Sequence, residues 1–285
     1  MTKTASAFRT TREKIYQALT ICVGCVLWAI LGLAMCVNWY SNTPGAHFVH
    51  EVAGYGLSFT AIYLIVGAAY RASAFGNMIL LSPRQFPQLY TMVVECSREI
   101  GLSTPPATFI YNSNGLFNAF ARRLCGRRFV FLTSALIDAT SDAQVRFVVG
   151  HELGHHAAGH LNPWLNALRL PACLVPLLDR AYSRSREYTC DRIGAYLAKD
   201  PAVSRTALQM LGCGCRRLNE SMNCEAFMEQ ERLVPPIFGF LTEIHRSHPR
   251  LTRRVAAIKA EATRGRDGHV ENDEPVFHSS AGANY

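Results

Sequence analysis

Charged residues are scarce in this chain of 285 residues, at 18%, and two long stretches contain no Asp, Glu, Lys or Arg. These stretches cover residues 15–46 and 52–70. Each is long enough to cross a bilayer, which takes about 20 helical residues. The apolar centre of the first is longer than the ~7 to 15 residues of a secretory signal, so we expect a retained anchor. We predict transmembrane helices over residues 15–40 and 52–70, after an N-terminal tail over residues 1–14.

Basic residues are absent from the short loop between the two stretches, whereas they precede the first stretch and follow the second. Lys and Arg concentrate on the cytoplasmic side of membrane proteins, so both ends of the chain should face the cytoplasm. The net charge of +8 suits contact with anionic lipid. No aromatic-basic motif indicates a nucleic-acid partner. The sequence predicts a multi-pass protein of the inner, cytoplasmic membrane, with the lipid bilayer as a partner and the larger domain on the cytoplasmic side.

The ten cysteines lack the arrangement of a disulfide scaffold or a structural zinc site. The chain is too long and too hydrophobic for a small stapled domain, and a cytoplasmic domain would be kept reduced. Cys22 and Cys25 lie within the first apolar stretch, and Cys213 and Cys215 have no second pair at zinc spacing. We therefore expect these thiols to be free.

Internal repeats and low-complexity blocks are also absent. An amphipathic helix is predicted from about Gln88 to Ile100, before three short β-prone runs over residues 107–111, 119–121 and 129–133. Arginines around Cys125 and Gly126 indicate a hairpin tip that is either solvated or in contact with lipid or substrate. We predict a small antiparallel sheet.

Helical patterns dominate the rest of the chain, over residues 183–197 and 203–218. Three prolines interrupt the apolar segment 161–178, which we interpret as a broken helical hairpin at the membrane surface. Residues 264–285 are polar and predicted to be disordered. The expected fold class is α+β and predominantly helical, with the small sheet in a soluble domain over residues 85–263.

The motif His151-Glu152-Leu153-Gly154-His155 carries the most chemical information. A capping box over Ser141 to Gln144 and an apolar periodicity predict that the motif lies on a helix. Residues four apart lie on one helix face, so both imidazoles can bind one zinc ion beside the Glu152 carboxylate. This pattern is typical of zinc metallopeptidases, although the five residues alone also occur on ordinary helices.

A catalytic zinc site needs a third protein ligand, with water in the fourth position. A metzincin would place a histidine at position 161, which is leucine here. Glu187 is the better candidate, because a carboxylate on a second helix can complete the set. Asp191 lies one turn later and could accept the second N–H of a zinc-bound histidine. Taken alone, a Glu and an Asp four residues apart on an Arg-bearing helix are more often surface charges.

Four motifs in order resemble the HtpX-like membrane zinc metallopeptidases, relatives of the CAAX prenyl endopeptidases. The first is Asn118-Ala119-Phe120, and the second is the His-Glu-x-x-His helix. Glu187 with Asp191 forms the third, and His248-Pro249 followed by Arg254 forms the fourth. One departure is Cys190, where alanine is usual in that family.

The resemblance implies a zincin-like peptidase domain with one Zn²⁺ per subunit, held by His151, His155 and Glu187. It implies Glu152 as the general base, with His248 and Arg254 as auxiliary catalytic residues. Backbone pairing along an edge strand could bind an extended substrate without demanding one sequence, which assigns substrate binding to Asn118, Ala119 and Phe120. His156 and His160 stay outside the core site, as outer-sphere or exposed residues.

The expected function is endoproteolysis of unfolded or damaged membrane proteins, with no prediction of the oligomeric state. Two alternatives stay open. One is a CAAX-type prenyl-protein endopeptidase, although such enzymes carry more membrane spans. The other is a catalytically silent membrane chaperone or scaffold, a fate that usually erases the base or a ligand.

Overall fold

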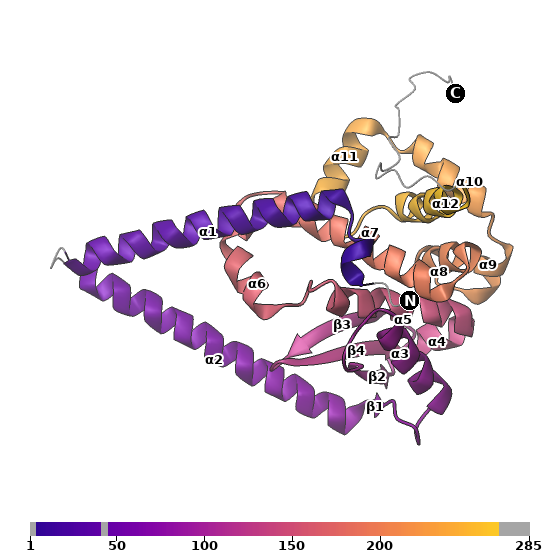
Figure 1. Ribbon diagram of the computed structural model, residues 1–285, viewed down its shortest axis with the longest axis horizontal. Helices are drawn as coiled ribbons and strands as arrows, with labels where there is room; N and C mark the ends of the chain where they lie inside the picture. The colour runs from indigo at the N-terminus through magenta and orange to yellow at the C-terminus, as the bar shows by residue number, and fades with distance from the viewer. Residues whose placement is uncertain (1–3, 41–44, 268–285) are drawn as a thin grey trace.

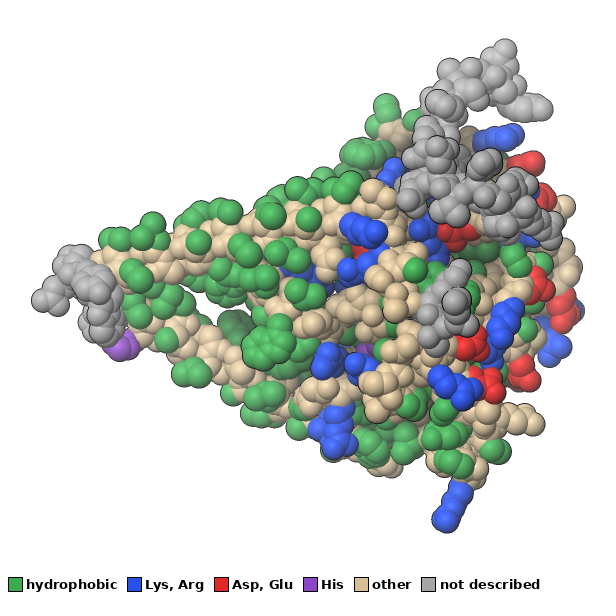
Figure 2. All heavy atoms as spheres, in the orientation of Figure 1, with side chains coloured by type: hydrophobic (Ala, Val, Ile, Leu, Met, Phe, Trp, Pro, Cys, Tyr) green, Lys and Arg blue, Asp and Glu red, His purple; other side chains and the backbone are tan. Residues whose placement is uncertain are grey.

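The computed structural model describes residues 4–40 and 45–267. Two long helices, α1 (Thr11–Tyr40) and α2 (Gly45–Asn77), diverge in a V from one end of the molecule, and all other elements lie towards the open end (Figure 1). Both helices are longer than the spans predicted at 15–40 and 52–70, and both are long and apolar enough to cross a membrane. Only 11% and 6% of their most apolar windows are buried within the protein, so neither is the core helix of a soluble domain. Figure 2 shows hydrophobic side chains along both helices, with charged side chains gathered around the rest of the molecule.

The sheet has four strands among the described residues: β1 (Ile79–Leu80), β2 (Ala107–Tyr111), β3 (Ala119–Leu124) and β4 (Arg127–Thr133). Their spatial order is β1-β2-β4-β3. The β3–β4 and β1–β2 pairs are antiparallel, but β2 and β4 are parallel. The prediction of a wholly antiparallel sheet was therefore wrong. After β2 the chain passes through a loop to β3, which lies at the outer edge of the sheet. Strand β4 then lies between β2 and β3.

Strand β4 is buried on both faces because the sheet is covered on both sides. Val130 and Leu132 belong to the core between one face of the sheet and the helices that pack on that face. Phe129 and Phe131 belong to an aromatic cluster on the opposite face, which Tyr70 of α2 joins. The Tyr70 and Phe131 rings meet edge to face at 5.5 Å, so the end of α2 packs directly against the sheet.

The remaining helices form the bulk of the domain, which confirms the predicted α+β, mainly helical fold class. Their bounds are η1 (Ala5–Phe8), α3 (Pro87–Glu99), α4 (Ser134–Ala139), α5 (Asp142–Ala157), α6 (Pro163–Arg169), η2 (Leu170–Leu174), α7 (Leu178–Ala198), α8 (Pro201–Cys213), α9 (Arg216–Ser221), α10 (Cys224–Glu229), η3 (Gln230–Leu233), α11 (Pro236–Ile244) and α12 (Leu251–Asp267). Helix α12 extends into the segment 264–285 that was predicted to be disordered, and residues 268–285 lie outside the described residues.

The interrupted segment 161–178 forms the short elements α6 and η2, which lie along α1. Gly24 of α1 allows this approach, because a Cβ atom there would lie 2.3 Å from the Leu168 carbonyl oxygen. The Trp28 indole also donates a hydrogen bond to the Ala167 carbonyl, at 3.0 Å. Pro163 and Pro171 stand at the first turns of α6 and η2, where a missing N–H costs no helical hydrogen bond.

Helices α5 and α7 cross at glycines, and this crossing brings two of the sequence motifs together. A Cβ atom on Gly194 of α7 would lie 2.8 Å from the Phe147 carbonyl oxygen of α5. A Cβ atom on Gly150 would lie 3.0 Å from the Gly194 Cα atom. Only glycine permits this separation, so the two backbones touch and the side chains next to the crossing face one another.

Candidate metal centre

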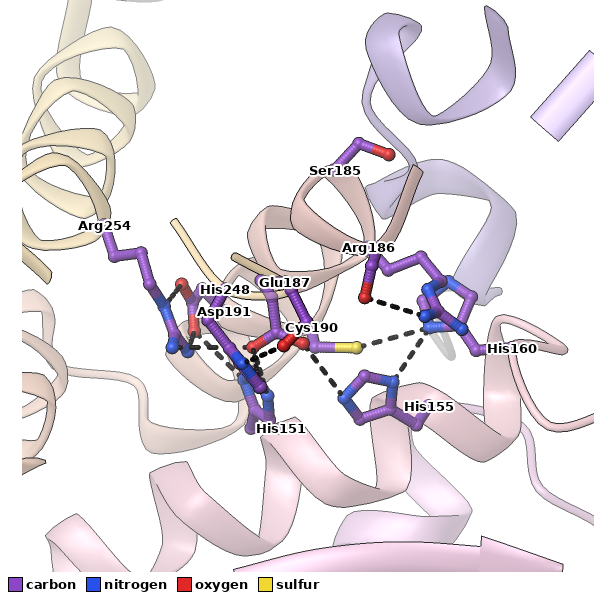
Figure 3. A network of polar contacts seen from close by, with 12 residues as sticks. His151, His155, His160, Ser185, Arg186, Glu187, Cys190, Asp191, His248 and Arg254 are labelled. Carbon is purple, nitrogen blue, oxygen red and sulfur yellow. Dashed lines mark hydrogen bonds and ion pairs between the residues drawn. The ribbon is translucent and has the colours of Figure 1, made fainter. Parts of the chain in front are cut away.

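The two motif histidines point from α5 towards one carboxylate on α7 (Figure 3). The Ser141 side chain and Gln144 form the expected capping box, which fixes where α5 begins. The Nε2 atom of His151 lies 3.5 Å from Glu187 Oε2, and the Nε2 atom of His155 lies 3.7 Å from Glu187 Oε1. Ligand atoms about 2.0 to 2.1 Å from a tetrahedral zinc ion lie roughly 3.3 to 3.4 Å apart. Both predicted histidine ligands therefore lie at about this separation from the Glu187 carboxylate.

Asp191 fixes the orientation of His151 from the same helix. Its Oδ1 atom lies 3.0 Å from His151 Nδ1. Arg254 of α12 donates two hydrogen bonds of 2.7 Å to the Asp191 carboxylate, and its Nη1 atom lies 3.4 Å from Glu187 Oε2. A carboxylate that receives the second N–H of a metal-binding imidazole fixes its tautomer. Glu187 and Asp191 of the third motif therefore contact His151 of the His-Glu-x-x-His helix, and Arg254 of the fourth motif contacts both carboxylates.

The charges of this cluster suit a divalent cation. Burial opposes ionisation of Glu187, but its hydrogen bond with His151 and the charge of Arg254 hold its pKa well below the usual range. At His155, burial lowers the pKa of the imidazole, which is therefore neutral and able to bind a metal. At His151, hydrogen bonds to Asp191 and Glu187 outweigh burial and raise the pKa to about 10. The space between these carboxylates therefore favours positive charge.

Cys190 provides a rival donor that the sequence did not select. One ligand atom each from His151, His155 and Cys190 lies within 4.8 Å of the others. However, the sulfur points towards His160, whose Nδ1 atom lies 3.6 Å away (Figure 3). Burial and the neighbouring carboxylates raise the pKa of the Cys190 thiol well above its usual value. Glu187, in contrast, faces the Nε2 atoms of both histidines, which favours it as the third donor.

Glu152 lies beside the two histidines, where burial raises its pKa to about 7 against the opposing charge of His151. Its carboxylate also forms a hydrogen bond with the backbone of Ala121 in β3. A carboxyl group with this pKa can both accept and release a proton near neutral pH.

A cleft with a volume of about 1070 Å³ opens over this cluster. Asn118 and Ala119 line it, together with His248. Phe120 does not point into the cleft, because it stacks on Phe131 at 4.9 Å on the opposite face of the sheet. Since β3 is an outer strand of the described sheet, the backbone of this segment lies at an edge.

His248 reaches the same carboxylate from the loop before α12. Its Nε2 atom lies 3.7 Å from Glu187 Oε2, and its side chain is 65% exposed to the cleft and solvent. Its Nδ1 atom pairs with the Ser247 hydroxyl at 2.9 Å. The fourth motif thus contributes one buried residue, Arg254, and one accessible residue, His248.

The sequence left His156 and His160 as outer-sphere or exposed residues, and the structure has both of them buried next to the proposed site. His160 is buried, and its Nδ1 atom lies 3.1 Å from His155 Nδ1. Its Nε2 atom lies 3.0 Å from Glu13 of α1. His156 is also buried and donates from Nε2 to the Phe129 carbonyl at 2.9 Å, away from the metal donors. The sequence showed His156 and His160 one helical turn apart, but nothing in it indicated a contact of His160 with Glu13, 147 positions away.

Comparison with known proteins agrees with this geometry. The sequence pattern of peptidase family M48 matches residues 83–172 and 165–262, which together are more than half of the chain. The chain belongs to peptidase family M48. The recognition of an HtpX-like metallopeptidase is thereby confirmed at the level of the family, and membership implies a metal cofactor.

Three relatives illustrate the range of similarity. The chain is 30% identical over 172 residues to the plastoglobule-localized metallopeptidase 48 of Arabidopsis thaliana, covering 55% of this chain and 49% of that protein. It is 26% identical to a protease HtpX homolog of Methanopyrus kandleri, covering 59% and 64% of the two chains. A protease HtpX homolog of Salinibacter ruber is 26% identical over 84% of this chain and 94% of its own length. The chain thus spans about half of the plastoglobule relative and nearly all of the Salinibacter relative.

Proposed function

We propose that this protein is a membrane-anchored zinc endopeptidase that hydrolyses peptide bonds in unfolded or damaged proteins. The observation that carries the proposal is the convergence of His151, His155 and Glu187 on one point beside Glu152, in an open cleft. All the groups needed for metal-assisted hydrolysis are therefore in place, which argues against a catalytically silent scaffold.

His151, His155 and Glu187 would hold one zinc ion. When bound, zinc lowers the pKa of a coordinated water from near 16 to about 7 and polarises the scissile carbonyl group. Asp191 keeps His151 in the tautomer that offers Nε2, and Arg254 neutralises part of the carboxylate charge. These contacts orient the ligands before substrate arrives.

Glu152 is the proposed general base and acid. A carboxylate oxygen of Glu152 takes the proton of the attacking water and returns it to the amine that leaves when the peptide bond breaks. Its pKa of about 7 suits both transfers. His248 lies at the accessible side of the cluster, where its imidazole can donate a hydrogen bond to the carbonyl oxygen as negative charge develops.

The edge position of β3 supports binding of an extended substrate. The backbone N–H and C=O groups of Asn118 are hydrogen-bonded to Thr133 of β4, so the free edge would begin at Ala119 and Asn118 would contribute its side-chain amide to the cleft. Backbone pairing along this edge gives affinity with little sequence demand. The cleft lining also includes apolar side chains, of which Leu211 and Leu233 are exposed. Exposed hydrophobic segments distinguish unfolded from folded proteins, so these exposed leucines suit the proposed substrates.

The two apolar helices support the membrane placement. Their exposed hydrophobic faces would lie in lipid, in an inner, cytoplasmic membrane with both ends of the chain on the cytoplasmic side. Segment 161–178 packs on α1 and exposes Trp164, Leu170 and Leu174, which supports its proposed contact with the bilayer. The proposed peptidase domain over residues 85–263 would then work next to the membrane surface.

The test is to purify wild type and Glu152→Gln in detergent, to measure bound zinc, and to follow cleavage of casein as an unfolded probe. We expect equal zinc in both proteins and chelator-sensitive cleavage by wild type alone. Zinc binding by both with cleavage by neither, on casein or on a prenylated CAAX peptide, would favour the scaffold. Cleavage confined to the prenylated peptide would favour the CAAX-type alternative.

A further inference from the structure

Glu13 stands at the start of the first apolar helix, yet its side chain is fully buried against the peptidase domain. Its Oε1 atom lies 3.0 Å from His160 Nε2, and its Oε2 atom accepts a hydrogen bond from the Thr189 hydroxyl of α7. Arg9, one turn earlier, forms an ion pair with the same carboxylate at 3.0 Å. Burying an ionised carboxylate is costly unless it is paired and hydrogen-bonded, and Glu13 meets that condition completely.

His160 connects this carboxylate to the metal cluster. Its ring is fully buried and lies between Glu13 and His155. The Nδ1 atoms of His155 and His160 are 3.1 Å apart, which is hydrogen-bond distance. Two ring nitrogens can pair in this way only when one carries a proton and the other does not.

The proposed zinc ligation fixes which nitrogen is which. If His155 offers Nε2 to the ion, its Nδ1 must carry the proton and donate to His160 Nδ1. His160 Nδ1 is then an acceptor, so its proton resides on Nε2 and is donated to Glu13 Oε1. With this assignment each of the two hydrogen bonds has one donor and one acceptor, and the series ends at the Glu13 carboxylate, which also pairs with Arg9.

The two histidine ligands are therefore supported differently. Asp191 reaches His151 directly from α7. His155 has no carboxylate at hydrogen-bond distance from its Nδ1 atom among the described residues, and His160 occupies that place. The carboxylate that completes the second support comes from the N-terminal helix instead.

We propose that Glu13 is a positioning residue of the metal centre, which acts through His160 to hold His155 in its metal-binding tautomer and orientation. This inference rests on the proposed function, because it takes His155 as a zinc ligand. It gives the N-terminal anchor a second role, since a residue on the helix that enters the membrane completes the support of the site. Withdrawal of α1 from the domain would then weaken metal binding without touching any ligand.

The experiment measures the zinc dissociation constant of the full-length protein in detergent by competition with a chromophoric chelator, and the visible absorption bands of the Co²⁺-substituted protein. Glu13→Gln keeps the size of the side chain and removes its charge. We expect zinc affinity to fall about 10- to 100-fold, the range found when outer hydrogen-bond partners of metal ligands are removed. We also expect the Co²⁺ bands to shift, because they report the ligand field at His155.

Phe8→Leu is the matched control. Phe8 packs on Tyr196 at 5.1 Å in the same docked segment, and its side chain has no polar group that could pair with His160. If docking of the segment were all that mattered, Phe8→Leu and Glu13→Gln would change zinc affinity equally, and the proposal would be wrong. Unchanged Co²⁺ bands and unchanged affinity in Glu13→Gln would also overturn it.

A double-mutant cycle with His160→Gln tests whether Glu13 acts through His160. We expect the effect of Glu13→Gln to disappear in the His160→Gln background, whereas an effect that persists there would contradict the proposed route. If His160→Gln does not fold, the comparison of Glu13→Gln with Phe8→Leu decides. Failure of the proposed zinc site looks different, since wild type would then bind no zinc, or His155→Ala would bind it as tightly as wild type.

Discussion

Arg254 binds Asp191 through two hydrogen bonds of 2.7 Å, from Nε and Nη2, although the two residues are 63 positions apart. Both side chains are buried. Asp191 is also the partner of His151, at 3.0 Å. The last helix of the described chain is therefore tied to the proposed metal site through one carboxylate.

This relationship predicts that Arg254→Gln harms both stability and metal binding. Removing one partner of a buried ion pair leaves the other charge uncompensated and costs about 3 to 5 kcal/mol. Burial and the loss of the Arg254 charge would both favour protonation of Asp191, so its hold on His151 would weaken. We expect a lower midpoint of thermal unfolding in detergent and weaker zinc binding.

Arg216→Gln provides the control for this prediction. Arg216 and Glu220 form an ion pair at 2.9 Å, with both side chains about two-thirds exposed. Exposed pairs contribute little to stability, so this variant should unfold like wild type. Equal shifts in the two variants would show that burial of the Arg254–Asp191 pair has no special effect.

The choice between Glu187 and Cys190 as third donor yields a second prediction. Glu187→Gln should lose stoichiometric zinc, because a neutral amide is a poor replacement for the carboxylate that faces both histidines. Cys190→Ala should retain zinc and chelator-sensitive cleavage of casein. Metal analysis of the two purified variants measures this directly. Zinc loss in Cys190→Ala with retention in Glu187→Gln would reverse the donor assignment.

Local patterns in the sequence predicted the parts of the site that lie within single elements. The capping box at Ser141 and the spacing of His151 and His155 follow from helix geometry, so the helix and its metal-binding face were predictable. The family resemblance then related Glu187, Asp191 and Arg254 to that face.

Contacts between distant segments could not be predicted in the same way. The parallel pairing of β2 with β4 depends on where the loop after Tyr111 carries the chain, and alternation within each strand does not encode that path. Glu13 looked like one of several charges before an apolar stretch, because a sequence does not show which face of the helix meets His160. Phe120 lay in the right segment, but its side chain points to the other face of the sheet.

The glycine crossing of α5 and α7 gives a third prediction, that Gly194→Ala impairs the site from a distance. The added methyl would lie 2.8 Å from the Phe147 carbonyl oxygen, a backbone atom that cannot rotate away. The helices must separate, at a cost of about 1 to 3 kcal/mol for an overpacked interior. The proposed zinc ligands are divided between the two helices, so separation of the helices would displace the ligands from one another. A 1 Å displacement should lower the rate of casein cleavage on the order of 100-fold, a larger loss than the change in unfolding free energy alone would cause.

Gly212→Ala is the matched variant for this effect. Gly212 lies within α8, and a Cβ atom there would make an ordinary contact of 3.5 Å with Leu251. Alanine is favoured over glycine in a helix, so this variant should be as stable as wild type or slightly more so. If Gly194→Ala keeps full activity and stability, the tight crossing does not hold the site together.

The hairpin tip between β3 and β4 provides the last prediction, which concerns how the domain meets the second apolar helix. A Cβ atom placed on Gly67 of α2 would lie 3.3 Å from the Cys125 sulfur at this tip. That approach is compatible with a disulfide. We expect Gly67→Cys to form a 67–125 cross-link under mild oxidation, detected by mass spectrometry of peptides before and after reduction.

Gly76→Cys on the same helix has no atom within 4 Å of its Cβ position and should form no such link with Cys125. Because Gly67 lies within the candidate span Val49–Asn77, a specific 67–125 link would place the arginine-rich tip against that span, whereas equal linking from both positions would show that α2 moves freely relative to the sheet.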